Sequence, residues 1–261
     1  MQGTPKKRVA LLSSLVIVFA MLLSACGSST TPNNTGGMAP ASQQIFKWGE
    51  LGSADFGSAL DPAQIQDQTD IYALQTFLTG LVQQNDKGQL VDQLAQSHTI
   101  SSDGLTYTFK LRPNLKWSDG TPLTAQDVAY GINRSILPAT NSPVSQYLSL
   151  IKGFDKVSTG KESSIIGDGV IVQDPTTLVV KLSQPASYFL YTFTYPTSYP
   201  VEKSLVDKYG KAWTDHLTQG GSDGPFKVSS YSHTVGLDLV PNPNYYGPKP
   251  KLSKLEIHIV G

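Results

Sequence analysis

The sequence predicts a mixed α and β fold, because strand-like and helix-like segments alternate along the chain. Residues 105–111 (LTYTFKL) alternate apolar and polar side chains, which is typical of a half-buried strand. Residues 125–136 place their apolar side chains on one helical stripe. Residues 170–172 and 178–182 are apolar, β-branched runs on either side of a short polar turn, which indicates a hairpin. We therefore place the chain in the α/β class, with mixed α+β organisation.

The first 25 residues are predicted to be a secretory signal peptide. Residues 6–8 (KKR) are basic, residues 9–23 are apolar, and the small residues Ser24 and Ala25 follow. The apolar run of about 15 residues is shorter than the roughly 20 that a permanent membrane-spanning helix needs. We therefore expect export and cleavage.

Residues 23–26 (LSAC) resemble the bacterial lipobox, in which the cysteine is acylated with diacylglycerol. Cys26 is the only cysteine, so it has no disulfide partner within the chain. We expect lipidation at Cys26, which would anchor the protein to the cell membrane without spanning it. Residues 26–44 are rich in Ser, Thr, Asn and Gly and have almost no large apolar residue, which predicts a flexible tether.

The first folded elements are predicted from residue 45 onward. Residues 45–48 are strand-like, and Asp61-Pro62 marks a turn. The following stretch is predicted to be a helix, because four apolar residues recur at helical spacing. These residues are Ile71, Leu74, Leu78 and Leu81. Asp103-Gly104 is a turn dipeptide, so the strand at 105–111 is expected to form a hairpin with the segment before it.

A strand, a turn and a helix are specified locally between residues 105 and 136. Asp119-Gly120 forms the turn, and Thr124 stands three residues before Asp127, the spacing of a helix capping box. The predicted helix packs one stripe, made of Ala125, Val128, Ala129, Ile132 and Ile136.

The last third of the chain is predicted to contain one helix and three strands. A second hairpin over 170–182 keeps Pro175 in its turn, where no strand hydrogen bond is lost. Residues 201–213 are predicted to be helical. Strands are predicted at 226–228, 237–239 and 255–259.

Charge and motifs exclude several classes of function. The chain has 20 Lys and Arg and 20 Asp and Glu, so no basic excess favours nucleic acid as a partner. The four histidines share no short ligand spacing, and we expect neither a metal nor a cofactor. We expect no enzyme activity, because the sequence has no His-Glu-x-x-His motif or Walker loop, and Asp103 and Asp119 lie in Asp-Gly turns.

Two blocks of the sequence resemble the extracellular solute-binding proteins of family 5, the oligopeptide- and dipeptide-binding lipoproteins of ABC importers. The first block runs from 80 to 128 and includes SSDGLTYTF at 101–109 and KWSDGTPLTAQDV at 116–128. The second block includes LSQP at 182–185, KYG at 208–210, GPFKV at 224–228 and NPNYYG at 242–247. Taken as a whole, the resemblance extends over nearly everything after Ile45.

The resemblance implies a periplasmic-binding-protein-like type II lobe with a smaller subdomain, within residues 45–261. The first lobe would comprise about 45–65 and 195–261, and the smaller subdomain about 66–194. Nothing in the chain corresponds to the family's second lobe, which closes over the ligand. The chain is expected to act outside the cytoplasmic membrane, bind a short peptide and deliver it to ABC permease subunits.

Six residues are candidates for ligand contact in this interpretation. Leu51, Gly52 and Ser53 follow the first strand, and Gly224, Pro225 and Phe226 lead into a later strand as the chain re-enters the first lobe. Two alternatives stay open. One is a structural or signalling lipoprotein that captures no solute, and the other is a protein on the same scaffold that binds nickel complexes, haem or oligosaccharides.

Overall fold

Two four-stranded sheets organise the part of the chain that the computed structural model describes, which comprises residues 39–51 and 60–260. The chain divides into two compact units, Met1–Pro40 and Ala41–Gly261, and every element named below belongs to the second. The predicted signal peptide, Cys26, Gly52 and Ser53 lie outside the described residues. Within the described residues, no helix has both the length and the apolar character needed to cross a membrane.

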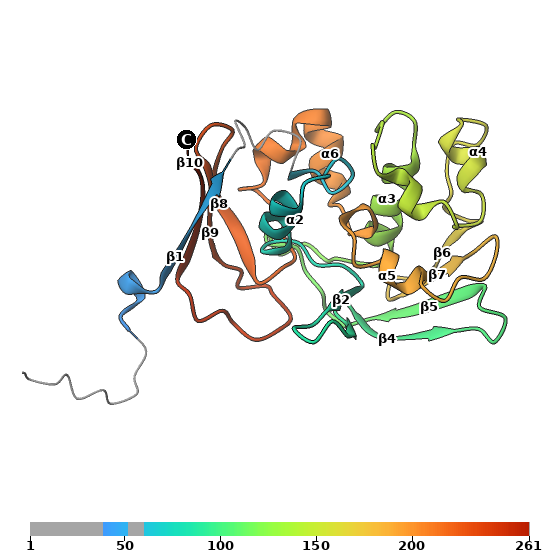
Figure 1. Ribbon diagram of the computed structural model, residues 1–261, viewed down its shortest axis with the longest axis horizontal. Coiled ribbons are helices and arrows are strands. Elements are labelled where there is room, and N and C mark those ends of the chain that lie inside the picture. Colours follow the sequence, from blue (N-terminus) through green and yellow to red (C-terminus); the bar gives the residue numbers. More distant parts are fainter. Residues whose placement is uncertain (1–38, 52–59, 261) are drawn as a thin grey trace, which may run out of the picture. The chain divides into compact units, whose positions relative to one another are not determined.

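The β1–β10 sheet joins the start of the described chain to its end. Its strands are β1 (Ile45–Leu51), β8 (Phe226–Ser232), β9 (Gly236–Pro241) and β10 (Lys254–Val260), in the order β1-β10-β9-β8. β1 runs parallel to β10, and the other neighbours are antiparallel. All four predicted strands are confirmed, and Figure 1 shows them together at the left.

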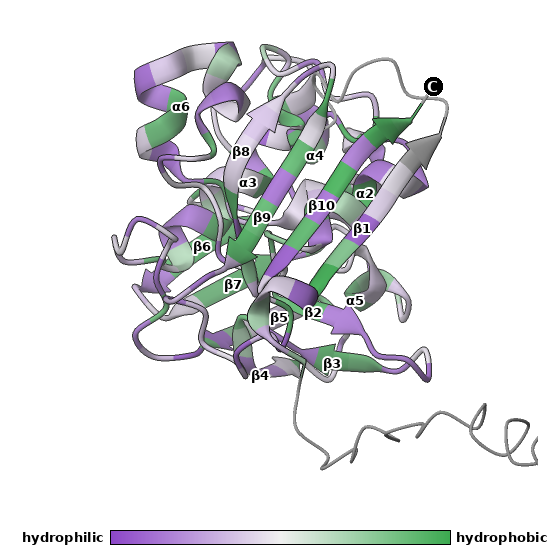
Figure 2. Cartoon of the chain, turned by 90° about the vertical axis from the view of Figure 1, so that its left-hand side faces the viewer, coloured by the Kyte–Doolittle hydropathy of each residue, from purple (hydrophilic) through white to green (hydrophobic). Residues whose placement is uncertain are grey.

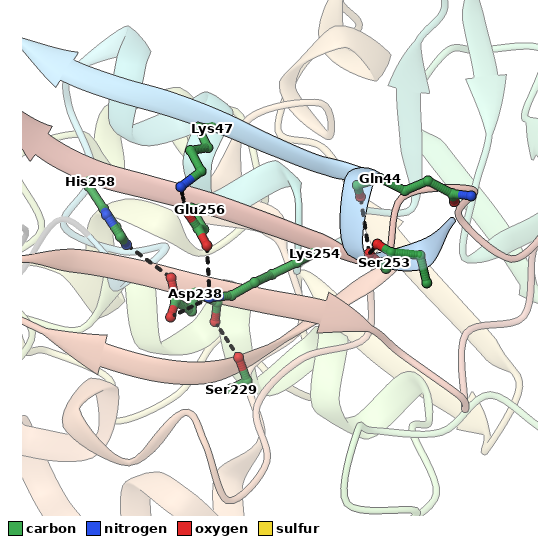
Figure 3. Close-up of polar contacts among 9 residues, drawn as sticks. Gln44, Lys47, Ser229, Asp238, Ser253, Lys254, Glu256 and His258 are labelled. Atoms are coloured by element: carbon green, nitrogen blue, oxygen red, sulfur yellow. Dashed lines mark hydrogen bonds and ion pairs between the residues drawn. The ribbon is translucent and has the colours of Figure 1, made fainter. Parts of the chain in front are cut away.

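The two faces of the β1–β10 sheet differ in chemistry, because alternate side chains point to opposite faces. Leu237, Leu239, Leu255 and Ile257 are buried. The other face carries a chain of ion pairs, shown in Figure 3: Lys47–Glu256 at 2.9 Å, Lys254–Glu256 at 2.9 Å, Lys254–Asp238 at 3.0 Å and His258–Asp238 at 2.9 Å. Figure 2 shows the same mixture as green and purple segments along β9 and β10.

The β4–β7 sheet consists of the two predicted hairpins placed side by side. β4 (Ala95–Ile100) pairs with β5 (Thr106–Leu111), β6 (Val170–Asp174) pairs with β7 (Thr177–Lys181), and β5 joins β7. Tyr107, Phe109 and Leu111 are buried, as the alternation predicts. A small hairpin of β2 (Val82–Gln84) and β3 (Leu90–Asp92) precedes this sheet.

The helix α3 (Ala125–Ile136) forms as predicted. The Thr124 backbone N–H donates to Asp127 Oδ2 at 2.8 Å, and the Thr124 hydroxyl accepts from the Gln126 N–H at 3.3 Å. All five residues of the predicted stripe are buried. The capping box therefore fixes the start of the helix, and the apolar stripe fixes its orientation.

The helix predicted over 71–81 is shorter than expected. α2 spans Gln68–Gln75, and Leu78 and Leu81 are buried in the loop that follows it. The carbonyl oxygens at the helix end bond to another part of the chain: Thr76 O accepts from Phe226 N, and Phe77 O accepts from both Asp223 N and Gly224 N. These long-range bonds replace the bonds that a continued helix would make.

The helix predicted over 201–213 forms in two pieces. α6 spans Lys203–Tyr209, and a 3-10 helix spans Gly210–His216. Gly210 has φ +60°, a left-handed conformation that breaks the α-helical path.

The sequence did not predict α4 (Phe154–Ser158), α5 (Phe189–Thr192) or the 3-10 turns at Ala41–Gln43, Ser145–Leu148 and Pro196–Ser198. The first of these turns lies within the predicted tether, and Gln44 O there accepts from Ser253 N at 2.9 Å.

Candidate functional site

A buried ion pair anchors the segment that follows the gap at residues 52–59. Arg134, in the last turn of α3, donates two hydrogen bonds of 2.6 Å to the two carboxylate oxygens of Asp61. The Asp61 side chain also accepts from Ala63 N at 3.0 Å and Trp213 Nε1 at 3.3 Å. This planar, bidentate geometry fixes both the position and the direction of the chain at residue 61.

The same segment is held twice more before it reaches α2. Gln64 Nε2 donates to Thr140 O at 2.6 Å, and the carbonyl oxygen of the buried Ile65 accepts from the Tyr195 hydroxyl at 3.2 Å. After these contacts the chain emerges at the surface over residues 66–69.

Residues 66–67, called here the free segment, expose main-chain groups that have no internal partner. Asp67 has an extended backbone, with φ −84° and ψ 141°. Among the described residues, nothing bonds to the N–H or C=O of Gln66 or to the N–H of Asp67. Two donors and one acceptor on these exposed residues therefore have no bond within the described part of the chain, and the contacts on their N-terminal side position the segment.

An aromatic hollow of about 480 Å³ lies next to the free segment, since Tyr195 lines it and bonds to the carbonyl oxygen of Ile65, one residue before that segment. Tyr195 packs against Tyr147, with ring centroids 4.5 Å apart. Burial raises the pKa of the Tyr195 phenol, and the charges of the neighbouring Tyr147 and Asp67 raise it further. Asp67 therefore interacts electrostatically with the Tyr195 side chain. The lining residues are Gln146, Tyr147, Ser149, Leu150, Tyr188, Phe189, Tyr191, Thr192, Thr194 and Tyr195.

A second hollow, of about 560 Å³, lies over the anchoring ion pair, between α3 and the α6 region. Asp61, Gln64 and Arg134 contribute to it, but all three side chains already bond to other parts of the protein. This hollow therefore surrounds the contacts that position the free segment.

The structure separates the two halves of the predicted ligand set. Leu51, the last residue of β1, pairs with Val260 at the C-terminal end of β10. Phe226 begins β8 and pairs with Pro241, at the other end of the sheet. The β1–β10 sheet therefore does not bring residues 51 and 226 together. A ligand role for Leu51, Gly52, Ser53, Gly224, Pro225 and Phe226 stays a prediction.

Most backbone groups around Gly224 bond within the protein. We call residues 223–226 the closed segment. Gly224 N donates to Phe77 O at 2.9 Å, Phe226 N donates to Thr76 O at 3.2 Å, and Asn242 donates to both Gly224 O and Pro225 O. A Cβ at residue 224 would lie 2.7 Å from the Phe77 carbonyl carbon, so only glycine fits.

Asp223 is a buried acid in the closed segment. Its Oδ1 accepts from Thr79 N at 2.9 Å, whereas its Oδ2 has no hydrogen-bond partner among the described residues. Burial raises the pKa of this carboxyl well above its ordinary value. The closed segment therefore favours a protonated Asp223.

The serine motifs at 149–152 and 220–224 lack the features of catalytic nucleophiles. Residues 220–224 match Gly-x-Ser-x-Gly, but Ser222 is 0% exposed and its hydroxyl has no hydrogen-bond partner in the described part of the chain. Residues 149–152 match Ser-x-x-Lys, but the Lys152 ammonium pairs with Asp168 at 2.6 Å. A nucleophile needs an adjacent base, and neither motif supplies one.

The described residues also contain no cluster of three or more His, Cys, Asp or Glu side chains arranged to hold a metal.

The sequence did not single out the free segment or the aromatic hollow. A signal was present in both cases. The polar run at 66–70 follows the Asp61-Pro62 turn, and tyrosines recur at 188, 191, 195 and 199. Neither signal distinguishes an exposed binding surface from an ordinary loop or a buried aromatic core.

Comparison with known families identifies a match to a solute-binding family. The model described as "Bacterial extracellular solute-binding proteins, family 5 Middle" matches residues 89–261. The chain is 31% identical over 247 residues to the dipeptide-binding protein of Lactococcus lactis subsp. cremoris, covering 93% of this chain and 42% of the relative. It is 30% identical over 258 residues to the oligopeptide-binding protein OppA of Bacillus subtilis, covering 98% and 46%.

Solved structures resemble the same region. Listeria monocytogenes OppA bound to peptide superposes with a TM-score of 0.75 at 26% identity, covering 83% of this chain and 42% of that one. The substrate-binding domain of an oligopeptide ABC transporter from Bacillus anthracis gives 0.73 at 28% identity, with 83% and 41% covered. These matches confirm the predicted periplasmic-binding-protein-like fold. The chain spans less than half the length of the relatives it matches.

Proposed function

Because the chain belongs to the bacterial extracellular solute-binding proteins of family 5, we propose that it binds short peptides outside the cytoplasmic membrane for an ABC importer. The observation that carries this proposal is the free segment, where main-chain donors and an acceptor are held unpaired next to an aromatic hollow. The relatives named above are peptide-binding proteins, and one solved relative holds a peptide.

The free segment suits the main chain of a peptide. An extended peptide satisfies exposed N–H and C=O groups by pairing alongside them, as an added strand does. Amide groups are the same in every peptide, so this mode of binding depends little on sequence. Because Asp61, Gln64 and Ile65 hold the segment, little conformational entropy is lost when the peptide binds.

The domain organisation is also part of the proposal. We assign the first lobe to about 45–65 and 195–261 and the smaller subdomain to about 66–194. The β1–β10 sheet, drawn from both ends of this range, supports the first assignment, and the β4–β7 sheet at 95–181 supports the second. The second lobe of the family would enclose the peptide from the other side.

We further propose that Cys26 carries a lipid anchor and that the anchored protein delivers its peptide to permease subunits. The lipobox-like sequence at 23–26 supports the anchor. Replacing the thiol in Cys26→Ser should move the protein from the membrane fraction to the soluble extracytoplasmic fraction. An unchanged distribution in cell fractionation would reject the anchor.

Calorimetric titration of the full-length protein with tetra- and pentapeptides tests the proposed function, with an equimolar mixture of free amino acids as the control ligand. Two variants at one position isolate the main chain. Asp67→Ala keeps the backbone N–H, whereas Asp67→Pro removes it at a φ of −84°, which proline tolerates with little strain.

One main-chain hydrogen bond contributes about 1 kcal/mol, so Asp67→Pro should bind peptide about fivefold more weakly than Asp67→Ala. Both variants should melt at the same temperature, because the N–H has no internal partner. Equal affinities in the two variants would contradict this binding mode, and no peptide binding by the native protein would contradict the function.

A further inference from the structure

The lining of the aromatic hollow contains no charged side chain. Four tyrosines and Phe189 make up half of its ten lining residues, and the remaining polar side chains carry neutral hydroxyls and one amide. A carboxylate or ammonium group that entered would lose hydration without meeting an opposite charge. The Asp67 carboxylate, which helps to raise the pKa of the lining residue Tyr195, would repel an anion further. The hollow therefore disfavours charged occupants, and acidic ones most.

The rim of the hollow exposes large aromatic side chains to water. Tyr147, Tyr188 and Tyr191 are 48%, 62% and 47% exposed. Large aromatic side chains gathered at one hollow on a protein surface mark a binding site more often than scattered ones do. Exposed tyrosines add amphipathic contact area at a low entropic cost, since each has only two side-chain torsions.

The floor of the hollow is rigid. Phe189 is fully buried and packs edge-on against Phe193, at 5.4 Å, and Tyr107, at 5.5 Å. The Tyr195 ring is held by its hydrogen bond to Ile65 O and by Tyr147. A flat ring that enters can therefore meet faces and edges already in place, which is the geometry that aromatic pairs prefer.

We propose that the aromatic hollow receives one side chain of the bound peptide and selects aromatic residues over aliphatic, basic and acidic ones. Tyr195 lines the hollow and bonds to the carbonyl oxygen of Ile65, the residue just before the free segment, so a peptide paired with residues 66–67 can insert a neighbouring side chain into the hollow. This inference rests on the proposed function, since it names the class of peptide for the same site.

The test uses full-length protein and pentapeptides Ala-Ala-X-Ala-Ala, with X as Phe, Leu, Lys, Glu or Ala. We expect the Phe peptide to bind at least tenfold more tightly than the Ala peptide. After Phe, the affinity should fall in the order Leu, Lys, Glu. In the double variant Tyr147→Ala/Tyr191→Ala, the Phe-to-Ala preference should fall below threefold. Tyr147→Phe should keep the preference, because the ring remains.

The matched control is Tyr72→Ala, which removes a 53%-exposed tyrosine on α2 that does not line the hollow. It should keep the full preference for Phe. If all five peptides bind equally, or if the double variant keeps the preference, the inference is wrong while the peptide-binding function stands. If no peptide binds, both this inference and the proposed peptide-binding function are wrong. A loss of self-association in the double variant, with no change in peptide preference, would instead assign the hollow to contact between protein copies.

Discussion

The free segment and the closed segment are both loops that precede a regular element, yet their backbones are used in opposite ways. In the closed segment the N–H groups of residues 223, 224 and 226 donate to the carbonyl oxygens of Thr76 and Phe77, just after α2, and two carbonyls accept from Asn242. In the free segment, two N–H groups and one C=O have no partner among the described residues. A family resemblance alone favoured ligand contact at the closed segment. The distribution of hydrogen bonds favours the free segment instead, because a ligand can use only groups that the fold leaves available.

The largest expected effect comes from removing the anchor of the free segment. Arg134→Met leaves the Asp61 carboxylate buried without its charged partner, and should lower the free energy of unfolding by about 3–5 kcal/mol. The control is Lys254→Met, which also removes a cation with two carboxylate contacts, but one that is more exposed than Arg134; it should cost under about 1 kcal/mol. Urea unfolding measures both, and similar costs would contradict the role of the anchor.

Substitution by alanine distinguishes the two segments. Gly224→Ala places a Cβ 2.7 Å from the Phe77 backbone and should cost about 1–3 kcal/mol, because the closed segment must move away from α2. Gln66→Ala, in the free segment, should change stability by less than about 0.5 kcal/mol. The comparison fails if the two variants unfold at the same urea concentration.

The closed segment should also impose a pH dependence. The Asp223 pKa is raised from 3.8 in the folded state, so folding takes up a proton and stability falls as pH rises above about 3.8. Asp223→Asn removes this cost and should be more stable than the native protein by roughly 1–2 kcal/mol at pH 8. The difference should vanish near pH 4. A difference that is constant from pH 4 to pH 8 would show that Asp223 does not titrate as argued.

The charged face of the β1–β10 sheet gives the smallest effect, since its paired groups range from partly buried to exposed, with Lys47 open to water (Figure 3). Lys47 and Lys254 lower the pKa of Glu256 from 4.5 to about 2. Its ion pairs therefore stabilise the fold above pH 4.5, and this contribution is lost as pH falls toward 2. Glu256→Gln should melt slightly below the native protein at pH 7 and at the same temperature near pH 2. A larger difference in melting temperature at pH 2 than at pH 7 would contradict the predicted direction of this pH dependence.

Elements encoded by contiguous residues were predictable from the sequence. The two hairpins follow from Asp103-Gly104 and the Pro175 turn, and α3 follows from the Thr124–Asp127 capping box and one apolar stripe. Elements that depend on distant partners were not. The early end of α2 results from bonds to residues 223–226, and the parallel pairing of Ile45 with Lys254 joins segments about 200 residues apart.

The candidate site was unpredictable for the same reason. An unpaired N–H is a property of what the rest of the fold fails to reach, and no residue type signals it. Gln66 and Asp67 are ordinary polar loop residues in the sequence. Only the contacts of Asp61 with Arg134 and of Ile65 with Tyr195 show that their backbone is both held and left open.

Amide hydrogen exchange tests the central claim most directly. In full-length protein saturated with the Ala-Ala-Phe-Ala-Ala peptide, the amides of Gln66 and Asp67 should exchange at least tenfold more slowly than in the free protein. The amides of Gly224 and Phe226, already bonded within the fold, should exchange at an unchanged rate. If the peptide is bound and the exchange of Gln66 and Asp67 does not slow, the free segment is not where the peptide main chain binds.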